Sequence, residues 1–209
     1  MLTALRGVYL ITPDQNDTDA LLTATAPLLA VGPALLQYRN KSADAALRLQ
    51  QARALQALCV QYGVPLLVND EVALAEAVGA AGVHLGEDDG ELAAARARLG
   101  TDAIIGASCY NQPGLAVRAR DAGASYIAWG AFHPSSTKPL ARRADPQLLR
   151  DGAALGLPQV AIGGITADNG GVLVQAGADL LAVINGVYAA PDPVAALRAC
   201  QSLFPKDSR

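Results

Sequence analysis

The sequence predicts a single-domain α/β protein folded as a (β/α)8 barrel, the TIM-barrel class. Eight short apolar runs alternate along the chain with eight Ala- and Leu-rich stretches of helical periodicity. Alternating strands and helices favour a parallel sheet, and eight such units in 209 residues favour a closed barrel over an open doubly wound sheet. No Gly-x-Gly-x-x-Gly motif follows the first run, which argues against a dinucleotide-binding fold. We expect residues 1–209 to form one barrel domain.

The eight apolar runs are expected to be strands. Most lack an alternation of apolar and polar residues, as is typical of strands buried on both faces. In chain order, they are residues 7–12, 34–39, 65–69, 82–85, 103–108, 125–130, 158–163 and 179–185.

The stretches between the apolar runs are expected to be amphipathic helices. A glycine follows many of them before the next strand, which is typical of a helix C-cap. These glycines are Gly63, Gly82, Gly100, Gly123, Gly156 and Gly177. In chain order, the expected helices are residues 17–30, 43–62, 71–80, 91–99, 113–122, 146–155, 167–176 and 193–203.

Composition excludes several classes of protein. Hydrophobic residues make up 52% of the chain and charged residues 17%, which argues against disorder. The formal net charge of −3 gives no support to nucleic-acid binding. Three cysteines without a Cys-x-x-Cys spacing predict neither a disulfide framework nor a zinc site. A reducing cytoplasm is therefore the expected location.

One stretch superficially resembles a membrane span. Residues 20–38 carry no charge. However, Pro27, Gly32 and Pro33 interrupt this stretch, so it is interpreted as a helix, a turn and a strand. No signal peptide is recognised before the first strand, and we expect no membrane association.

The most informative polar motif follows the second predicted strand. Gln37, Arg39 and Lys41 are spaced by two residues, which places them on one face of an extended chain. Because the carboxyl ends of the strands meet at one mouth of a barrel, these side chains would line that mouth. An arginine there suits a phosphate group. The alternative is that both cations simply reach water.

Two aspartates follow neighbouring predicted strands. Asp70 comes after 65–69 and Asp89 after 82–85. Each is placed where it could cap the next helix. Together they could instead share Mg2+, which prefers one or two carboxylates and substrate phosphate oxygens. The residues alone leave both interpretations open.

The longest connection and the last two strand ends also carry candidates. Residues 131–145 form a long loop with Ser135, Thr137 and Lys138, and such loops often act as lids or clamps. Arg142 and Arg143 in the same loop are expected to be solvated.

Gly163-Gly164 and Asn185-Gly186 end strands seven and eight, where many barrels bind phosphate through backbone N–H groups. His84 is expected to be a satisfied core residue, and His133 has no predicted partner.

As a set, seven motifs resemble the thiamine-phosphate synthase family across nearly the whole chain. They are QYRNK, LLVND, GVHLGEDD, IIGASCYN, SYIAWGAFHPSSTK, VAIGGIT and AVING. The resemblance implies a small (β/α)8 barrel that acts on two phosphorylated small molecules. It would join 4-amino-5-hydroxymethyl-2-methylpyrimidine diphosphate to 4-methyl-5-(2-phosphoethyl)thiazole, releasing pyrophosphate and forming thiamine phosphate. The resemblance also implies that pyrophosphate leaves first and that the thiazole nitrogen captures the resulting cation.

The resemblance also assigns roles by motif. It implies that the pyrimidine diphosphate is bound by Gln37, Arg39, Lys41, Asn69 and Lys138. It implies that Asp70 and Asp89 coordinate Mg2+ and that Ser108 hydrogen-bonds near the pyrophosphate and the reacting carbon. The thiazole phosphate would be bound by Ser135, Thr137 and the backbone at Gly164, Ile184 and Asn185. Among these residues, Arg39, Ser108 and Lys138 would stabilise the leaving group.

A charge comparison supports the metal. The three cations of this set and its two aspartates leave a charge of +1, whereas a pyrophosphate group carries about −3. One Mg2+ would bring the site close to balance. Three positions depart from the family pattern: Glu87 replaces a usual Gln, Asn185 replaces a usual Ser, and residues 132–134 replace a shorter approach to Thr137. Their effect on activity is left open.

Two other functions stay open at this stage. A related thiazole tautomerase would need an acid–base residue but no diphosphate or metal site. A non-catalytic phosphate-binding barrel would explain the glycine turns, but not two carboxylates facing an anion. The sequence does not determine oligomeric state, and a homo-oligomer is compatible with it.

Overall fold

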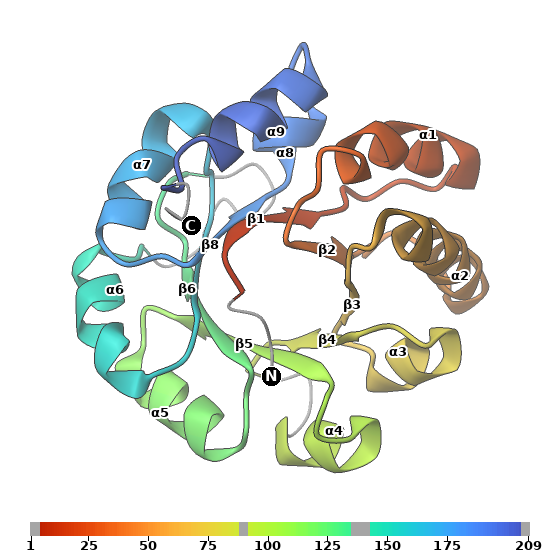
Figure 1. Ribbon diagram of the computed structural model, residues 1–209. Helices are drawn as coiled ribbons and strands as arrows, with labels where there is room; N and C mark the ends of the chain where they lie inside the picture. Colours follow the sequence, from red (N-terminus) through yellow and green to blue (C-terminus); the bar gives the residue numbers. More distant parts are fainter. Residues whose placement is uncertain (1–4, 88–91, 135–142, 206–209) are drawn as a thin grey trace.

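The protein is a closed barrel of parallel strands. The computed structural model describes residues 5–87, 92–134 and 143–205 (Figure 1). Each strand pairs with the next in chain order, and β8 returns to pair with β1. The predicted fold class is confirmed. The strands are β1 (Gly7–Ile11), β2 (Leu35–Tyr38), β3 (Leu66–Asn69), β4 (Gly82–Leu85), β5 (Ile104–Tyr110), β6 (Tyr126–Gly130), β7 (Gln159–Ile162) and β8 (Leu180–Val183).

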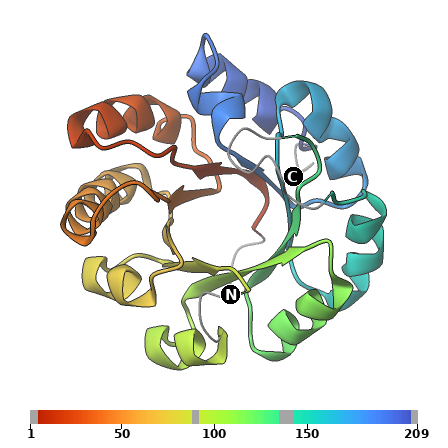
Figure 2. The same ribbon diagram turned by 180° about the vertical axis from the view of Figure 1, so that it is seen from behind.

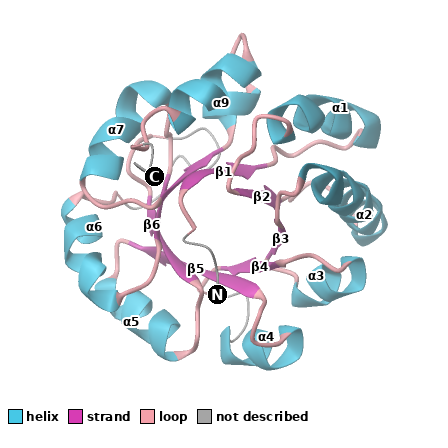
Figure 3. Ribbon diagram, in the orientation of Figure 1, coloured by secondary structure: helices cyan, strands magenta, loops and turns pink. Residues whose placement is uncertain are grey.

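Helices surround this barrel on its outside. The ring is visible from both directions (Figures 1 and 2), and colouring by structure type separates it from the inner strands (Figure 3). The helices are α1 (Thr18–Leu29), α2 (Ala45–Tyr62), α3 (Val72–Val78), α4 (Leu92–Leu99), α5 (Pro113–Asp121), α6 (Gln147–Gly152), the 3-10 helix η1 (Ala153–Leu155), α7 (Ala167–Gln175), α8 (Asn185–Tyr188) and α9 (Pro193–Gln201). In the described part of the chain, no helix combines the length and apolarity needed to cross a membrane.

Side-chain caps explain where several helices begin. The carboxylates of Asp17, Asp44 and Asp192 accept hydrogen bonds from the first turns of α1, α2 and α9. Such caps satisfy backbone donors that have no partner inside the helix. At its C-terminus, α2 ends on Gly63 in a left-handed conformation, as expected. The expected cap at Gly82 is wrong, because Gly79 caps α3 and Gly82 begins β4.

The apolar residues form two cores. One lies between the strands and the helices and includes Leu10, Leu36 and Trp129. The other fills the barrel interior and includes Leu35, Leu67 and Leu180. The second core explains why the strands read as continuous apolar runs, since both of their faces are buried.

The largest departures from the expected boundaries lie at the strand ends. The strand expected at 179–185 ends at Val183, and residues 185–188 form the unpredicted short helix α8. The strand expected at 103–108 continues to Tyr110 through a register irregularity against β6. The helix expected at 146–155 is divided into α6 and η1.

Candidate active site

A cavity of about 670 Å³ opens at the carboxyl ends of the strands. Its size suits a small-molecule site. All eight strands, or the loops that follow them, contribute to its lining. Its lining includes Tyr9, Ile11, Gln37, Arg39, Lys41, Asn69, Asp70, His84, Glu87, Ser108, Tyr110, Ala128, Val160, Ile162, Gly163, Gly164, Ala182, Ile184, Asn185 and Gly186.

Most of the predicted site residues meet in this cavity. Residues separated by up to 148 positions in the chain, from Gln37 to Asn185, line the same space. The predicted residues found there are Gln37, Arg39, Lys41, Asn69, Asp70, Ser108, Gly164, Ile184 and Asn185. Asp89, Ser135, Thr137 and Lys138 lie outside the described residues.

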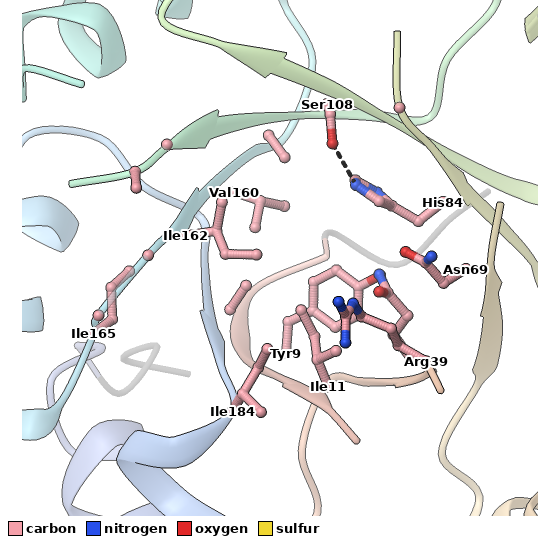
Figure 4. Close-up of a pocket in the computed structure, with 18 of the residues that line it drawn as sticks. Tyr9, Ile11, Arg39, Asn69, His84, Ser108, Val160, Ile162, Ile165 and Ile184 are labelled. Atoms are coloured by element: carbon pink, nitrogen blue, oxygen red, sulfur yellow. Dashed lines mark hydrogen bonds between the residues drawn. The ribbon is translucent and has the colours of Figure 1, made fainter. Parts of the chain in front are cut away.

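The cavity has a polar side and an apolar side. Arg39, Asn69 and His84 lie on one side, with Ser108 hydrogen-bonded to His84 (Figure 4). Ile162 and Ile184 lie on the opposite side, from β7 and the end of β8 (Figure 4). The cavity therefore offers a charged surface for an anion and an apolar wall for a ring.

Arg39 and Lys41 both contact carboxylates. Arg39 Nη1 donates to Asp14 Oδ1 at 2.8 Å. The same Asp14 oxygen accepts a hydrogen bond from the backbone N–H of Lys41 at 2.9 Å. The Lys41 ammonium contacts the carboxylate of Asp70. Only 14% of the Arg39 side chain is exposed, against 55% for Lys41. The alternative, that these cations simply reach water, is therefore wrong for Arg39.

Asp70 does not cap the helix that follows it. The N-cap position of α3 is occupied by Glu71, which makes no side-chain capping bond. Asp70 has φ of +64°, a left-handed conformation uncommon outside glycine. Its carboxylate accepts a hydrogen bond from Asn69 Nδ2 at 2.6 Å and contacts Lys41. The capping interpretation of Asp70 is wrong, and its carboxylate belongs to the cavity.

A chain of hydrogen bonds crosses the floor of the cavity. Gln37 Nε2 donates to the Tyr9 hydroxyl at 2.6 Å, and the Tyr9 and Tyr126 hydroxyls are 2.8 Å apart. His84 Nδ1 lies 2.8 Å from the Tyr126 hydroxyl, and His84 Nε2 lies 2.9 Å from Ser108 Oγ. Burial raises the pKa of both tyrosines, so both hydroxyls are protonated.

Sequence reasoning missed the functional position of three members of this chain. It gave none of the three a role in the site and expected His84 to be a satisfied core residue. His84 is indeed buried and hydrogen-bonded, but it also lines the cavity. The spacing along the strands was an available signal. Side chains two residues apart lie on the same face of a strand, so Tyr9 shares a face with Ile11, as Gln37 does with Leu35.

The glycines at the last two strand ends allow close packing. A β-carbon at Gly163 would lie 2.4 Å from Ala131 Cβ, and one at Gly164 would lie 2.2 Å from the carbonyl oxygen of Pro134. At Gly186, it would lie 2.2 Å from the carbonyl oxygen of Ile165. These glycines are therefore needed to pack the loops at the mouth, whether or not a ligand approaches them.

His133 and Arg143 lie near the two ends of the long loop, residues 131–145. The backbone N–H of His133 donates to Gly163 O at 3.0 Å, and Arg143 Nη1 donates to Phe132 O at 3.2 Å. Burial lowers the pKa of His133, and the positive charge of Arg143 lowers it further. Arg143 is exposed, as expected, and it also bonds the start of the loop. Arg142 lies outside the described residues.

Comparison with known proteins gives one consistent result. A protein-family profile described as thiamine monophosphate synthase matches residues 8–187. The chain is 63% identical over 201 residues to the thiamine-phosphate synthase of Xanthomonas campestris pv. campestris, covering 95% of this chain and 96% of that protein. It is 55% identical to the thiamine-phosphate synthase of Xylella fastidiosa, covering 98% of this chain and 87% of that protein.

Solved structures agree with the sequence matches. The thiamine phosphate pyrophosphorylase of Pyrococcus furiosus superposes with a TM-score of 0.85 at 30% identity, covering 97% of each chain. The orotidine 5'-phosphate decarboxylase of Pyrococcus horikoshii has a TM-score of 0.67 at 16% identity, covering 94% of this chain and 98% of that chain. The second likeness reflects the barrel fold alone. From the matched profile and the two bacterial relatives, we conclude that the chain belongs to the thiamine monophosphate synthase family.

Proposed function

We propose that this protein is a thiamine-phosphate synthase. It would condense 4-amino-5-hydroxymethyl-2-methylpyrimidine diphosphate with 4-methyl-5-(2-phosphoethyl)thiazole, giving thiamine phosphate and pyrophosphate. The observation that carries the proposal is the two-sided cavity, in which cationic side chains face an apolar wall at the barrel mouth. Membership of the family supports the same reaction.

The reaction asks the protein to stabilise charge rather than to remove a proton. The bond between the pyrimidine methylene carbon and the diphosphate oxygen breaks first, and its electron pair leaves with pyrophosphate. The lone pair of the thiazole nitrogen then forms the new C–N bond to the pyrimidine cation. Fixed donors directed at the leaving group accelerate such a step. We assign this role to Arg39, Ser108 and Lys138.

The remaining contacts divide between the two substrates. Gln37, Lys41 and Asn69 would bind the pyrimidine diphosphate on the polar side. Ser135 and Thr137 would bind the thiazole phosphate, together with the backbone at Gly164, Ile184 and Asn185. The apolar wall formed by Ile162 and Ile184 suits the thiazole ring.

The residues present fit a magnesium ion. The Asp70 carboxylate lines the cavity beside two nitrogen donors, Asn69 and Lys41. Mg2+ is commonly bound by one or two carboxylates and substrate phosphate oxygens, so Asp70 and Asp89 would hold it. Within the described residues, no group of three or more His, Cys, Asp and Glu side chains forms a metal site by itself. Bound there, Mg2+ would neutralise charge on the diphosphate.

The direct test is an assay for both products. The purified protein would be incubated with the two substrates and Mg2+, and thiamine phosphate and pyrophosphate would be quantified. We expect equal amounts of the two products, and none when either substrate or the metal is omitted. Substrate binding without product would instead support a phosphate-binding barrel.

The isomerase alternative is less well supported by the cavity. A tautomerase needs a side chain that can exchange a proton with its substrate. His84, the histidine that lines the cavity, has both ring nitrogens within hydrogen-bond distance of protein hydroxyls. We therefore prefer the synthase.

Three wider inferences belong to the same proposal. We infer that one barrel domain accounts for residues 1–209 and that its ligands are small phosphorylated molecules rather than nucleic acid. A cytoplasmic location is supported by three cysteines that are free and buried. A homo-oligomer remains compatible with the proposed function.

A further inference from the structure

The polar chain on the cavity floor joins the two ends of the proposed diphosphate site. Gln37 comes from β2 and Ser108 from β5, and between them lie Tyr9 of β1, Tyr126 of β6 and His84 of β4. Tyr126 therefore reaches across the barrel to neighbours on other strands. Its hydroxyl is within hydrogen-bond distance of both Tyr9 and His84, so it connects the two halves of this series of hydrogen bonds.

The fold makes specific room for Tyr126. Gly106 lies inside β5, where glycine weakens a strand and often marks a close approach. A β-carbon at Gly106 would lie 1.9 Å from Tyr126 Cζ and 2.2 Å from its hydroxyl oxygen. The Tyr126 ring also stacks on His84, with ring centroids 5.7 Å apart and planes 12° apart. The position of the Tyr126 hydroxyl is thus fixed by packing on both sides.

The direction of the hydrogen bonds follows from Gln37. Because Gln37 Nε2 donates to the Tyr9 oxygen, the Tyr9 proton must find its own acceptor. Among the described residues, the oxygen of Tyr126 supplies it. The reverse arrangement would leave a buried donor unsatisfied, which is costly.

The same reasoning continues to the other end. The Tyr126 proton is donated to His84 Nδ1, so the proton on the neutral imidazole sits on Nε2. His84 Nε2 then donates to Ser108 Oγ. The Ser108 oxygen accepts this bond, and its own proton is left to donate to an acceptor in the cavity.

We propose that Tyr126 and His84 are positioning residues that hold the Ser108 hydroxyl as a hydrogen-bond donor toward a diphosphate oxygen. This inference rests on the proposed function and adds how that site is oriented. Neither residue needs to touch the reacting atoms. Their effect passes through Ser108. It is lost if any hydrogen bond in the series from Gln37 to Ser108 is removed.

The test is a double-mutant cycle between Tyr126 and Ser108, which have no hydrogen bond with each other. The four proteins are wild type, Tyr126→Phe, Ser108→Ala and the double variant. Calorimetry measures their affinity for inorganic pyrophosphate with Mg2+. We expect Ser108→Ala to weaken binding about tenfold and Tyr126→Phe about threefold to tenfold. The double variant should be no more than about twofold weaker than Ser108→Ala, because the two changes remove one interaction.

Controls separate positioning from general damage. Tyr188→Phe removes another tyrosine hydroxyl, which makes a part-buried hydrogen bond with Thr25 outside the cavity. It should leave pyrophosphate affinity unchanged. If Tyr126→Phe unfolds the protein, Tyr9→Phe interrupts the same series of hydrogen bonds at another position. It should show the same coupling to Ser108.

The outcomes distinguish this inference from the proposed function. Losses that multiply, to about 30-fold to 100-fold in the double variant, would overturn the positioning role. A wild-type protein that does not bind pyrophosphate would overturn it as well. Parallel measurement of thiamine phosphate formation tests the function separately. If the effects of the two substitutions on binding are coupled but no thiamine phosphate forms, the synthase is refuted and the positioning role stands. If thiamine phosphate forms but the two effects are independent, the positioning role is refuted and the synthase stands. Steady-state kinetics gives a further readout. In an active enzyme, Tyr126→Phe should change kcat more than the KM for the thiazole phosphate, because its effect acts on the diphosphate through Ser108.

Discussion

At the scale of single residues, charged side chains at the strand ends define the polar side of the cavity. Arg39 is largely buried and paired with Asp14, whereas Lys41 contacts Asp70 at the cavity edge. A bound diphosphate would therefore meet cations that already have carboxylate neighbours. In the proposed function, Mg2+ would compensate for those carboxylates.

Lys138 carries the largest predicted effect on the chemistry. Lys138→Ala should lower kcat by about 10²–10³, the loss observed when one charge-stabilising donor is removed. Lys138→Arg keeps the charge and should recover part of the rate. Steady-state kinetics with both substrates provides the measurement. An alanine variant with the wild-type rate would remove Lys138 from the mechanism.

Asp70 tests the metal site separately from folding. Asp70→Asn keeps the side-chain shape but removes the charge, and it should raise the Mg2+ concentration for half-maximal activity by about tenfold or more. Thermal unfolding should change little, because Asp70 does not cap α3. For comparison, removing the side-chain cap at Asp192 should lower stability by about 1 kcal/mol. An unchanged Mg2+ requirement would contradict the assignment.

Part of the residue-level site was predictable and part was not. The two-residue spacing of Gln37, Arg39 and Lys41 placed them at the mouth without any structure. The hydrogen bond between Tyr9 and Tyr126 was not predictable, because the two hydroxyls meet only when β1 and β6 face each other across a closed barrel. Asp70 could not be separated from a cap, because capping and metal binding use the same residue type.

At the scale of elements, helix ends and strand crossings set the geometry. Arg96 on α4 is an example. Its guanidinium donates to the carbonyl oxygens of Gly100, Thr101, Ala103 and Gly123 and to the hydroxyl of Ser125. It thereby ties the end of α4 to the turns that lead into β5 and β6.

This arrangement gives a matched prediction within one helix. Arg96→Ala should destabilise the protein by about 2–3 kcal/mol, since it leaves several backbone acceptors without their donor. That loss corresponds to a fall in Tm of roughly 4–12 °C for a chain of this size. Arg98→Ala removes an exposed ion pair with Glu76 and should cost at most about 1 kcal/mol. Calorimetry of the two variants compares them directly, and equal shifts would contradict the role of Arg96.

Gly106 gives the corresponding prediction for a strand. Gly106→Ala places a methyl group against the Tyr126 ring, and overpacking of this kind typically costs about 1–3 kcal/mol. It should also lower pyrophosphate affinity, because Tyr126 must move. Gly114→Ala in α5 meets no atom closer than 3.7 Å and should be tolerated. A fully stable and active Gly106→Ala protein would show that Tyr126 is not held in place as described.

Element boundaries were less predictable than element types. Continuous apolar runs identified every strand, because both faces of a barrel strand are buried. The runs do not show where pairing stops, so α8 was missed after Val183. The glycine pattern also gave a wrong helix cap at Gly82. Glycine is required there because the backbone of Ile104 lies too close for a side chain, not because a helix ends there.

At the scale of the whole molecule, barrel closure assembles the site. Its residues belong to eight strand ends spread along the chain, and they share one cavity only because β8 pairs with β1. The apolar interior below the mouth contains residues such as Leu35 and Leu180. The chemistry is therefore confined to one end of the barrel, with the diphosphate expected on the side of β2 to β5.

The most direct measurement is a crystal structure with pyrophosphate and Mg2+ bound. Our account predicts diphosphate density on the polar side of the cavity, contacting Arg39 and Asn69, with the metal at Asp70. Ser108 should donate its hydroxyl to a diphosphate oxygen. Pyrophosphate bound elsewhere on the protein, with this cavity containing only solvent, would contradict the account.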